Sequence, residues 1–227
     1  MVRALIFDFN GVLADDDPIH MRALQRVADE EGLSITEAEY LDTYLPLNDW
    51  DCFRTLYATQ ARLLSPENCD DLIRRKSVYY YQAIADKSVL FEGAANAVIS
   101  AASRFKLAIA SGARKGEILH ILGQAGLQPF FPVIIAAEDV THGKPHPEPF
   151  MRACAELNKL FGSIAPSACI AVEDSIGGIE SAHEAGMRCL GIAHSYSSAR
   201  LKTAKPEWII ESIADFPVWL EQEVSSP

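Results

Sequence analysis

Five polar side chains in this sequence follow short apolar runs or lie in the loop after one, and their types could support chemistry on an anion. They are Asp8, Ser111, Lys144 and the adjacent pair Glu173 and Asp174. Apolar runs that alternate with helical patterns indicate a parallel sheet, in which ligands bind outside the carboxyl ends of the strands. The sequence therefore predicts one crevice lined by a hydroxyl, an ammonium group and three carboxylates.

The three carboxylates require a cation, because like charges in one crevice disfavour each other's ionised forms. Oxygen ligands with open positions suit Mg²⁺, which keeps bound waters and shares the phosphate of a substrate. Lys144 would add a compact positive charge beside a nucleophile and a phosphate. Ser111 and Gly112 begin a turn into a helix, where backbone N–H groups and the helix dipole favour phosphate.

The elements that must position these side chains are six short apolar runs without alternation. Such runs are typical of strands that helices cover on both faces, and helical patterns lie between most of them. We therefore expect an α/β fold with a doubly wound, Rossmann-like parallel sheet. The runs are residues 4–7, 106–110, 133–137, 169–172, 190–193 and 208–210.

Residues 16–87 contain no convincing strand and predict an inserted, all-helical cap domain. Thr36 with Glu39 fits a capping box, and Ser65 followed by Pro66 fits a helix start. The Rossmann-like core would then comprise residues 1–15 and 88–227. Residues 15–17 and 86–91 would connect the two domains.

Composition restricts the possible functions. The chain has 227 residues, of which 49% are apolar and 22% charged, as in ordinary globular proteins. A net charge of −11 argues against nucleic-acid binding, which needs a basic face. The five cysteines form no Cys-x-x-Cys pair, so we expect reduced core thiols. No signal segment or membrane-spanning run is recognised, so we expect a cytoplasmic protein without membrane partners.

Four segments carry a resemblance to a known family. In order along the chain they resemble the first to fourth motifs of the haloacid-dehalogenase superfamily, and the inserted cap resembles its β-phosphoglucomutase-like branch. The segments are residues 8–15 (DFNGVLAD), 109–112 (IASG), 143–150 (GKPHPEPF) and 172–179 (VEDSIGGI). The resemblance covers nearly the whole chain and implies a small-molecule phosphate-monoester hydrolase.

The resemblance also implies a role for each matching residue. Asp8 would attack phosphorus and form an aspartyl phosphate. Mg²⁺ would be held by Asp8, the backbone carbonyl of Asn10, Glu173 and Asp174, and the transferring phosphoryl group by Ser111 and Lys144.

One position departs from the family pattern. Asn10 stands where relatives carry the aspartate that protonates the leaving oxygen and then activates water, and an amide does neither. Three explanations remain open. Another group carries the proton, with Asp15, Asp16 or His20 nearest; the asparagine was introduced to trap an intermediate; or the protein binds phosphorylated ligands and turns them over poorly.

Three further residues are candidates by position. His20 resembles a histidine at the cap–core mouth of relatives, and Arg114 follows Ser111 closely enough to widen its positive field. Lys76 falls where related caps carry a substrate-side lysine, although its basic run favours a solvated face. His142 and His146 do not predict a zinc site, because no third ligand pattern accompanies them.

The sequence therefore predicts a Mg²⁺-dependent phosphatase of small phosphorylated metabolites, with sugar phosphates as the expected class. A phosphosugar mutase and a weakly active phosphometabolite-binding protein remain the alternatives. We expect a monomer or a weak homodimer.

Overall fold

Residues 1–15 and 89–227 form one unit of the computed structural model, and residues 16–88 form the other. The structure describes residues 1–45, 47–85 and 87–224. Asp86, where the second connection was expected to begin, lies outside these residues. The two units are called the core unit and the helical unit below.

A six-stranded parallel sheet forms the centre of the core unit, in the order β3-β2-β1-β4-β5-β6. This is the order of the doubly wound Rossmann fold, so the predicted fold class is confirmed. The third strand is shorter than predicted, because Ala136 turns away and donates its N–H to Asp139. The strands are β1 (Ala4–Phe7), β2 (Lys106–Ala110), β3 (Val133–Ile135), β4 (Cys169–Glu173), β5 (Arg188–Ile192) and β6 (Trp208–Ile210).

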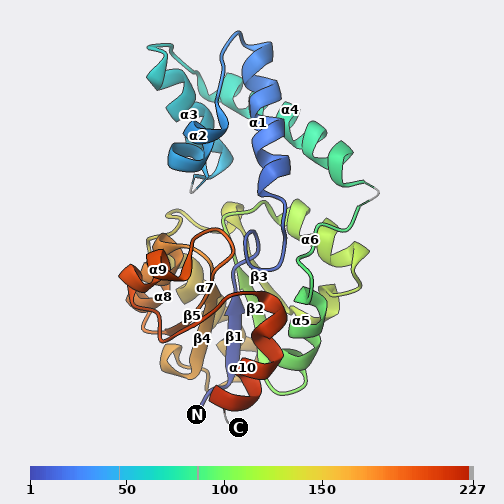
Figure 1. The fold of residues 1–227 in the computed structure, drawn as a ribbon, viewed down its shortest axis with the longest axis vertical. Coiled ribbons are helices and arrows are strands. Elements are labelled where there is room, and N and C mark those ends of the chain that lie inside the picture. Colours follow the sequence, from blue (N-terminus) through green and yellow to red (C-terminus); the bar gives the residue numbers. More distant parts are fainter. Residues whose placement is uncertain (46, 86, 225–227) are drawn as a thin grey trace. The chain divides into compact units, whose positions relative to one another are not determined.

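Helices cover both faces of this sheet (Figure 1). Because successive side chains point to opposite faces, Ile6 faces the layer of α7 and α8, whereas Phe7 contacts the rings of Phe131 and Phe216 on the other face. The helices are α5 (Ala94–Ala102), α6 (Lys115–Gln124), α7 (Glu148–Phe161), α8 (Ile176–Glu184), α9 (Ser198–Leu201) and α10 (Phe216–Glu223).

The helical unit contains no strand among its described residues. Both predicted helix starts are confirmed: Thr36 and Glu39 form a reciprocal capping box, and the Ser65 hydroxyl accepts the N–H of Asn68. Leu24, Phe53 and Leu72 belong to one buried apolar cluster that joins the three long helices. The elements are α1 (Asp17–Glu30), α2 (Glu37–Glu39), a π-helical turn (Tyr40–Tyr44), α3 (Asp49–Thr59) and α4 (Pro66–Ile84).

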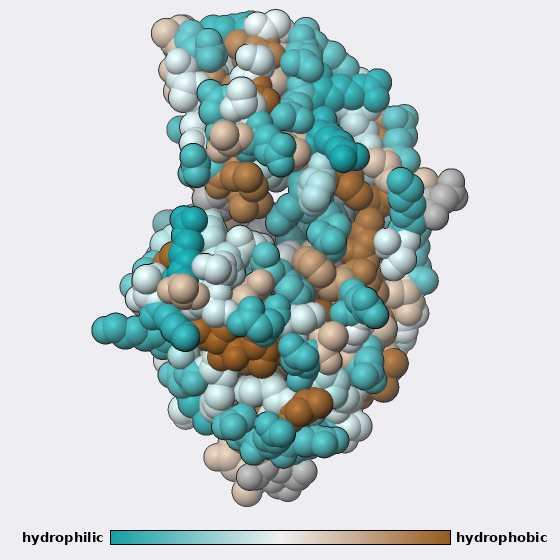
Figure 2. Space-filling model, viewed as in Figure 1, coloured by the Kyte–Doolittle hydropathy of each residue, from teal (hydrophilic) through white to brown (hydrophobic). Residues whose placement is uncertain are grey.

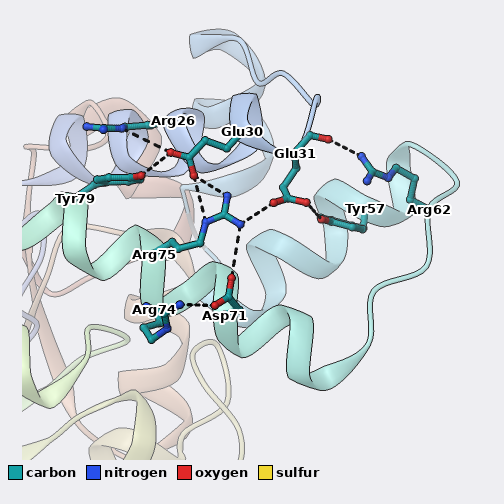
Figure 3. Close-up of polar contacts among 9 residues, drawn as sticks. All are labelled: Arg26, Glu30, Glu31, Tyr57, Arg62, Asp71, Arg74, Arg75 and Tyr79. Carbon is teal, nitrogen blue, oxygen red and sulfur yellow. Dashed lines mark hydrogen bonds and ion pairs between the residues drawn. The ribbon is translucent and has the colours of Figure 1, made fainter.

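Arg75 on α4 joins this helix to the end of α1 through charged contacts (Figure 3). Its guanidinium lies 2.6 Å from the Glu30 carboxylate and 2.7 Å from that of Glu31, both at the end of α1. It also lies 3.6 Å from Asp71. Hydrogen bonds from Tyr79 and from Arg75 lower the pKa of Glu30. One cation therefore contacts three acidic groups, of which Glu30 also pairs with Arg26 and Asp71 with Arg74.

We predict that Arg75→Met, which keeps the apolar stem, lowers hydrogen-exchange protection in α1 and α4 by up to about fivefold. The acidic groups would then repel one another, and added salt should shrink the loss by screening. Arg54→Met is the matched control, because Arg54 makes one exposed pair at 4.0 Å. Equal effects of both substitutions would show that Arg75 has no special role.

All five cysteines are buried thiols, as predicted, and the sulfur atoms of Cys154 and Cys169 lie 3.8 Å apart. In the described part of the chain, no helix has the length and apolarity that crossing a membrane requires. On the face drawn in Figure 2, hydrophilic side chains cover much of each unit and hydrophobic side chains form separate patches.

Candidate active site

The predicted carboxylates meet where the winding of the sheet reverses, between β1 and β4. Phe7 pairs with Val172, and the Asp8 N–H donates to the Val172 carbonyl at 2.8 Å. Asp8 therefore follows β1 directly beside Glu173 and Asp174 at the end of β4. One oxygen atom from each carboxylate lies within 4.8 Å of the others. All three residues are buried, and crevices at such reversal points are the usual ligand sites of this fold.

Lys144 lies between two of these carboxylates. Its Nζ donates to Asp8 Oδ1 at 2.7 Å and to Glu173 Oε1 at 2.5 Å. Burial alone would lower the pKa of Lys144, but the two adjacent carboxylates raise it above its ordinary value. The ammonium group therefore stays charged.

Asp8 is held in an unusual electrostatic environment for a carboxyl group. Burial raises its pKa to about 6; Lys144 opposes this shift and the Glu173 carboxylate adds to it. A bound cation would offset the burial penalty and favour the ionised form, which is the form that can act as a nucleophile.

Glu173 uses both of its oxygen atoms within the protein. Oε1 accepts from Lys144, while Oε2 accepts the N–H groups of Asp174 and Ser175 and the Ser175 hydroxyl. A Cβ at Gly178 would lie 1.8 Å from the carboxyl carbon of Glu173, so the glycine leaves room for it. Glu173 thus braces Lys144 and the start of α8, in addition to lying in the carboxylate cluster.

The oxygen donors fit Mg²⁺ rather than a soft transition metal. Asp8, Glu173 and Asp174 make up the cluster, and among the described residues neither a thiol nor an imidazole belongs to it. Asp8 and Asp174, with Glu173 as the neighbouring group, are the residues that would hold the ion.

Ser111 follows β2, the strand next to β1. Its side chain is buried, and its hydroxyl accepts the N–H of Ala113 at 3.1 Å. Gly112 is exposed in the same turn. Arg114 forms an ion pair with Glu138 at 3.4 Å and remains partly exposed, so part of its positive field is neutralised.

Asn10 lies in a tight turn after β1. The N–H groups of Leu13 and Ala14 both donate to the Phe9 carbonyl, and the Gly11 N–H donates back to Ala14. Gly11 has a φ of +74°, a conformation that favours glycine. This turn fixes the Asn10 backbone two residues from the candidate nucleophile.

His20 and Lys76 contact each other within the helical unit. Lys76 is 4% exposed, so its assignment to a solvated face is wrong. Its Nζ contacts Asp49 and lies 2.8 Å from His20 Nδ1. Lysine is a donor only, so the other ring nitrogen of His20 carries its proton toward Asp16, 3.3 Å away. The Tyr80 hydroxyl donates to the same carboxylate.

The loop that carries Lys144 also brings Glu148 beside His142 and His146, a neighbour that the sequence pattern did not indicate. The Glu148 carboxylate accepts the N–H groups of Thr141 and His142, and it pairs with Arg152 at 2.7 Å. These bonds lower the pKa of Glu148 to about 2. In the described structure this carboxylate fixes the loop.

Two residues of the site escaped the sequence analysis. The Ser195 hydroxyl donates to Asp174, and His194 Nδ1 lies 2.9 Å from the Gly11 carbonyl. Both directly follow the apolar run of residues 190–193, which belongs to β5 and its end, and this position after a strand is the signal that could have located them.

Comparison with known proteins agrees with this arrangement. The family model for haloacid dehalogenase-like hydrolases matches residues 5–192. A phosphorylated carbohydrates phosphatase from Thermotoga maritima is 27% identical over 94% of this chain and 99% of its own length. The fructose-1-phosphate phosphatase YqaB from Escherichia coli is 26% identical, over 83% of this chain and 95% of its own.

A solved structure shows the same fold. It is a mutant of CbbY from Rhodobacter sphaeroides, in complex with xylulose-(1,5)bisphosphate. It superposes with a TM-score of 0.83 at 25% identity, over 95% of this chain and 96% of that one. The motifs, the sheet order and these similarities together establish that the chain belongs to the haloacid dehalogenase-like hydrolase family, as a hydrolase of phosphoric monoesters.

Proposed function

We propose that this protein is a Mg²⁺-dependent phosphatase of small sugar phosphates and that its reaction proceeds through an aspartyl phosphate on Asp8. The observation that carries the proposal is the contact of the Asp8 carboxylate with Lys144 at 2.7 Å, beside the carboxylate of Asp174. This geometry combines a candidate nucleophile, the ammonium group of Lys144 and oxygen ligands for Mg²⁺.

In the first step an Asp8 oxygen forms a bond to phosphorus while the bond to the sugar oxygen breaks, and that oxygen takes up a proton, so that the sugar leaves as an alcohol. In the second step water attacks the phosphorus, gives up a proton, and releases the Asp8 carboxylate and inorganic phosphate. Lys144 and the Ser111 turn would hold the phosphoryl oxygens, whose negative charge is spread in the transition state. Bound Mg²⁺ would supply additional charge neutralisation at those oxygens.

Several groups complete the proposed site. Gly112 offers an exposed backbone at the phosphate turn, and Arg114 adds a partly neutralised positive charge. We propose the helical unit, which carries His20 and Lys76, as a cap domain. The Asn10 carbonyl would complete the metal ligands.

The sugar-phosphate class is supported by what related proteins act on. The Thermotoga maritima relative is a phosphatase of phosphorylated carbohydrates, and the Escherichia coli relative is a phosphatase of fructose 1-phosphate. An oxygen-lined site with a fixed ammonium group suits such a monoester.

We predict that Asp174→Asn lowers Mg²⁺-dependent release of phosphate from sugar phosphates by about 10² or more, because an anionic metal ligand becomes a neutral amide. Circular dichroism should show a folded protein. Glu221→Gln is the matched control, since Glu221 is an exposed carboxylate on α10.

Near-wild-type activity of Asp174→Asn would contradict the metal assignment. Acid quenching followed by peptide mass spectrometry tests the covalent step, because a phosphoryl group should appear on the peptide that contains Asp8. The phosphate-release assay should also monitor isomerised sugar phosphate, whose formation would favour a mutase over a hydrolase.

A further inference from the structure

The segment after β5 contacts the carboxylate site in two places, at the turn after β1 and at Asp174 after β4. The chain leaves the sheet at Ala193, whose N–H donates to the Ile210 carbonyl. His194 and Ser195 then lie against the turn after β1 and the end of β4. Neither residue belongs to the four motifs of the sequence.

The two ring nitrogens of His194 have fixed and different roles. Nδ1 lies 2.9 Å from the Gly11 carbonyl, and Nε2 lies 3.2 Å from the Ile213 backbone nitrogen, whose N–H it accepts. A carbonyl only accepts, so Nδ1 must carry the proton. The ring also stacks on Phe91 with centroids 3.9 Å apart. Burial lowers the pKa of His194, which agrees with a neutral ring that donates at one nitrogen and accepts at the other.

Ser195 contacts the carboxylate of Asp174, after the end of β4. Its hydroxyl donates to Oδ2 of Asp174. A Cβ at Gly11 would lie 2.0 Å from Asp174 Oδ2 and 2.8 Å from Ser195 Oγ. Gly11 is thus enclosed by His194 at its carbonyl and by Asp174 and Ser195 at its Cα. Small displacements of His194 or Ser195 would move the turn and the carboxylate together.

We propose that His194 and Ser195 are positioning residues for the metal site. His194 fixes the Gly11 carbonyl and with it the turn that carries Asn10, and Ser195 orients the Asp174 carboxylate. This inference rests on the proposed Mg²⁺ site. Hydrogen bonds to metal ligands and their supports commonly change metal affinity by about 10- to 100-fold.

Two substitutions at His194 separate positioning from general stability. In His194→Asn the side-chain amide nitrogen replaces Nδ1 and can donate to Gly11, whereas the bond from Ile213 is lost. In His194→Gln the longer side chain can reach Ile213, whereas the donor to Gly11 is lost. Both variants lose the ring that stacks on Phe91, so their unfolding midpoints should fall similarly.

We expect Mg²⁺ titration calorimetry to give a dissociation constant within about threefold of wild type for His194→Asn, and one about 10- to 100-fold weaker for His194→Gln. Ser195→Ala should weaken Mg²⁺ binding by a similar factor, and Ser195→Thr should restore it. Ser198→Ala is the control, because the Ser198 hydroxyl also donates to a carboxylate, Glu211, outside the site.

The outcomes separate this inference from the proposed function. If wild type binds Mg²⁺ and hydrolyses sugar phosphates, but the His194→Asn and His194→Gln variants bind Mg²⁺ equally, the positioning role is overturned and the function stands. Mg²⁺ affinity that follows the unfolding midpoint across all variants would also overturn it. If wild type neither binds Mg²⁺ nor releases phosphate, both proposals fail.

Discussion

Asn10→Asp is expected to raise the turnover of sugar phosphates by about 10² or more. The sugar alkoxide is a basic leaving group, so its departure depends on a proton that an amide does not supply. The leaving group of p-nitrophenyl phosphate is far less basic, and its hydrolysis should gain less. The measurement is kcat and kcat/KM for both substrates, with Asn96→Asp on α5 as an exposed control.

The pattern of gains distinguishes the explanations for Asn10. Small gains on both substrates would mean that another group already supplies the proton, and Asp15, Asp16 and His20 should then be substituted. His20 and Asp16 already form a pair at 3.3 Å in the helical unit. If Asn10→Asp stays inactive across a wide substrate screen, a binding protein becomes the better description.

Deamidation requires its own control in this experiment. Glycine after asparagine leaves the following amide open to cyclisation, so the Asn10-Gly11 pair can generate aspartate spontaneously. Peptide mass spectrometry of aged samples should accompany the kinetics. Activity that follows the deamidated fraction belongs to the aspartate form, and activity independent of it belongs to the asparagine enzyme.

Lys144→Met is expected to lower phosphatase activity by about 10²–10³, because one preorganised charge at the transferring group is removed. It should also lower the free energy of unfolding by about 3–5 kcal/mol, since two buried carboxylates lose their partner. Urea unfolding without Mg²⁺ measures the second effect. Lys159→Met on α7 is the control, because Lys159 makes an exposed pair with Glu156.

The stability loss in Lys144→Met should depend on pH. The pKa of Asp8 is already about 6 in the folded protein, and removing the ammonium group raises it further. A carboxyl group whose pKa is higher in the folded state than in the unfolded state destabilises the fold increasingly as the pH rises from the unfolded value to the folded value, and fully above it. The loss should therefore be largest above pH 6 and shrink as the pH falls and Asp8 is protonated.

A double substitution separates stability from activity in this experiment. Lys144→Met with Glu173→Gln should recover part of the stability, because one of the two uncompensated charges is removed. It should not recover activity. A Lys144→Met protein as stable as wild type at neutral pH would contradict the assignment of Lys144 as the partner of both carboxylates.

Much of this protein was predictable from the sequence, because its signals are local. Buried parallel strands need continuous apolar runs, so β1, β2 and β6 could be located by residue. Side chains that follow such strands share one edge of the sheet, which is why Asp8 and Asp174 could be assigned to one site. The capping box of Thr36 and Glu39 is local in the same way.

Only the tertiary structure decided which partner each of these groups has. Lys76 lies within a basic run, yet α4 directs its side chain inward, where it contacts Asp49 and His20. The basic run by itself does not show which of its residues faces the interior. The contact of Lys144 with Glu173 and that of Ser195 with Asp174 each join separate segments of the chain, and packing sets their distances. The sequence by itself determined the sheet and the residue types at its edge, whereas the tertiary structure decided their pairing, because pairing depends on contacts between residues far apart in the chain.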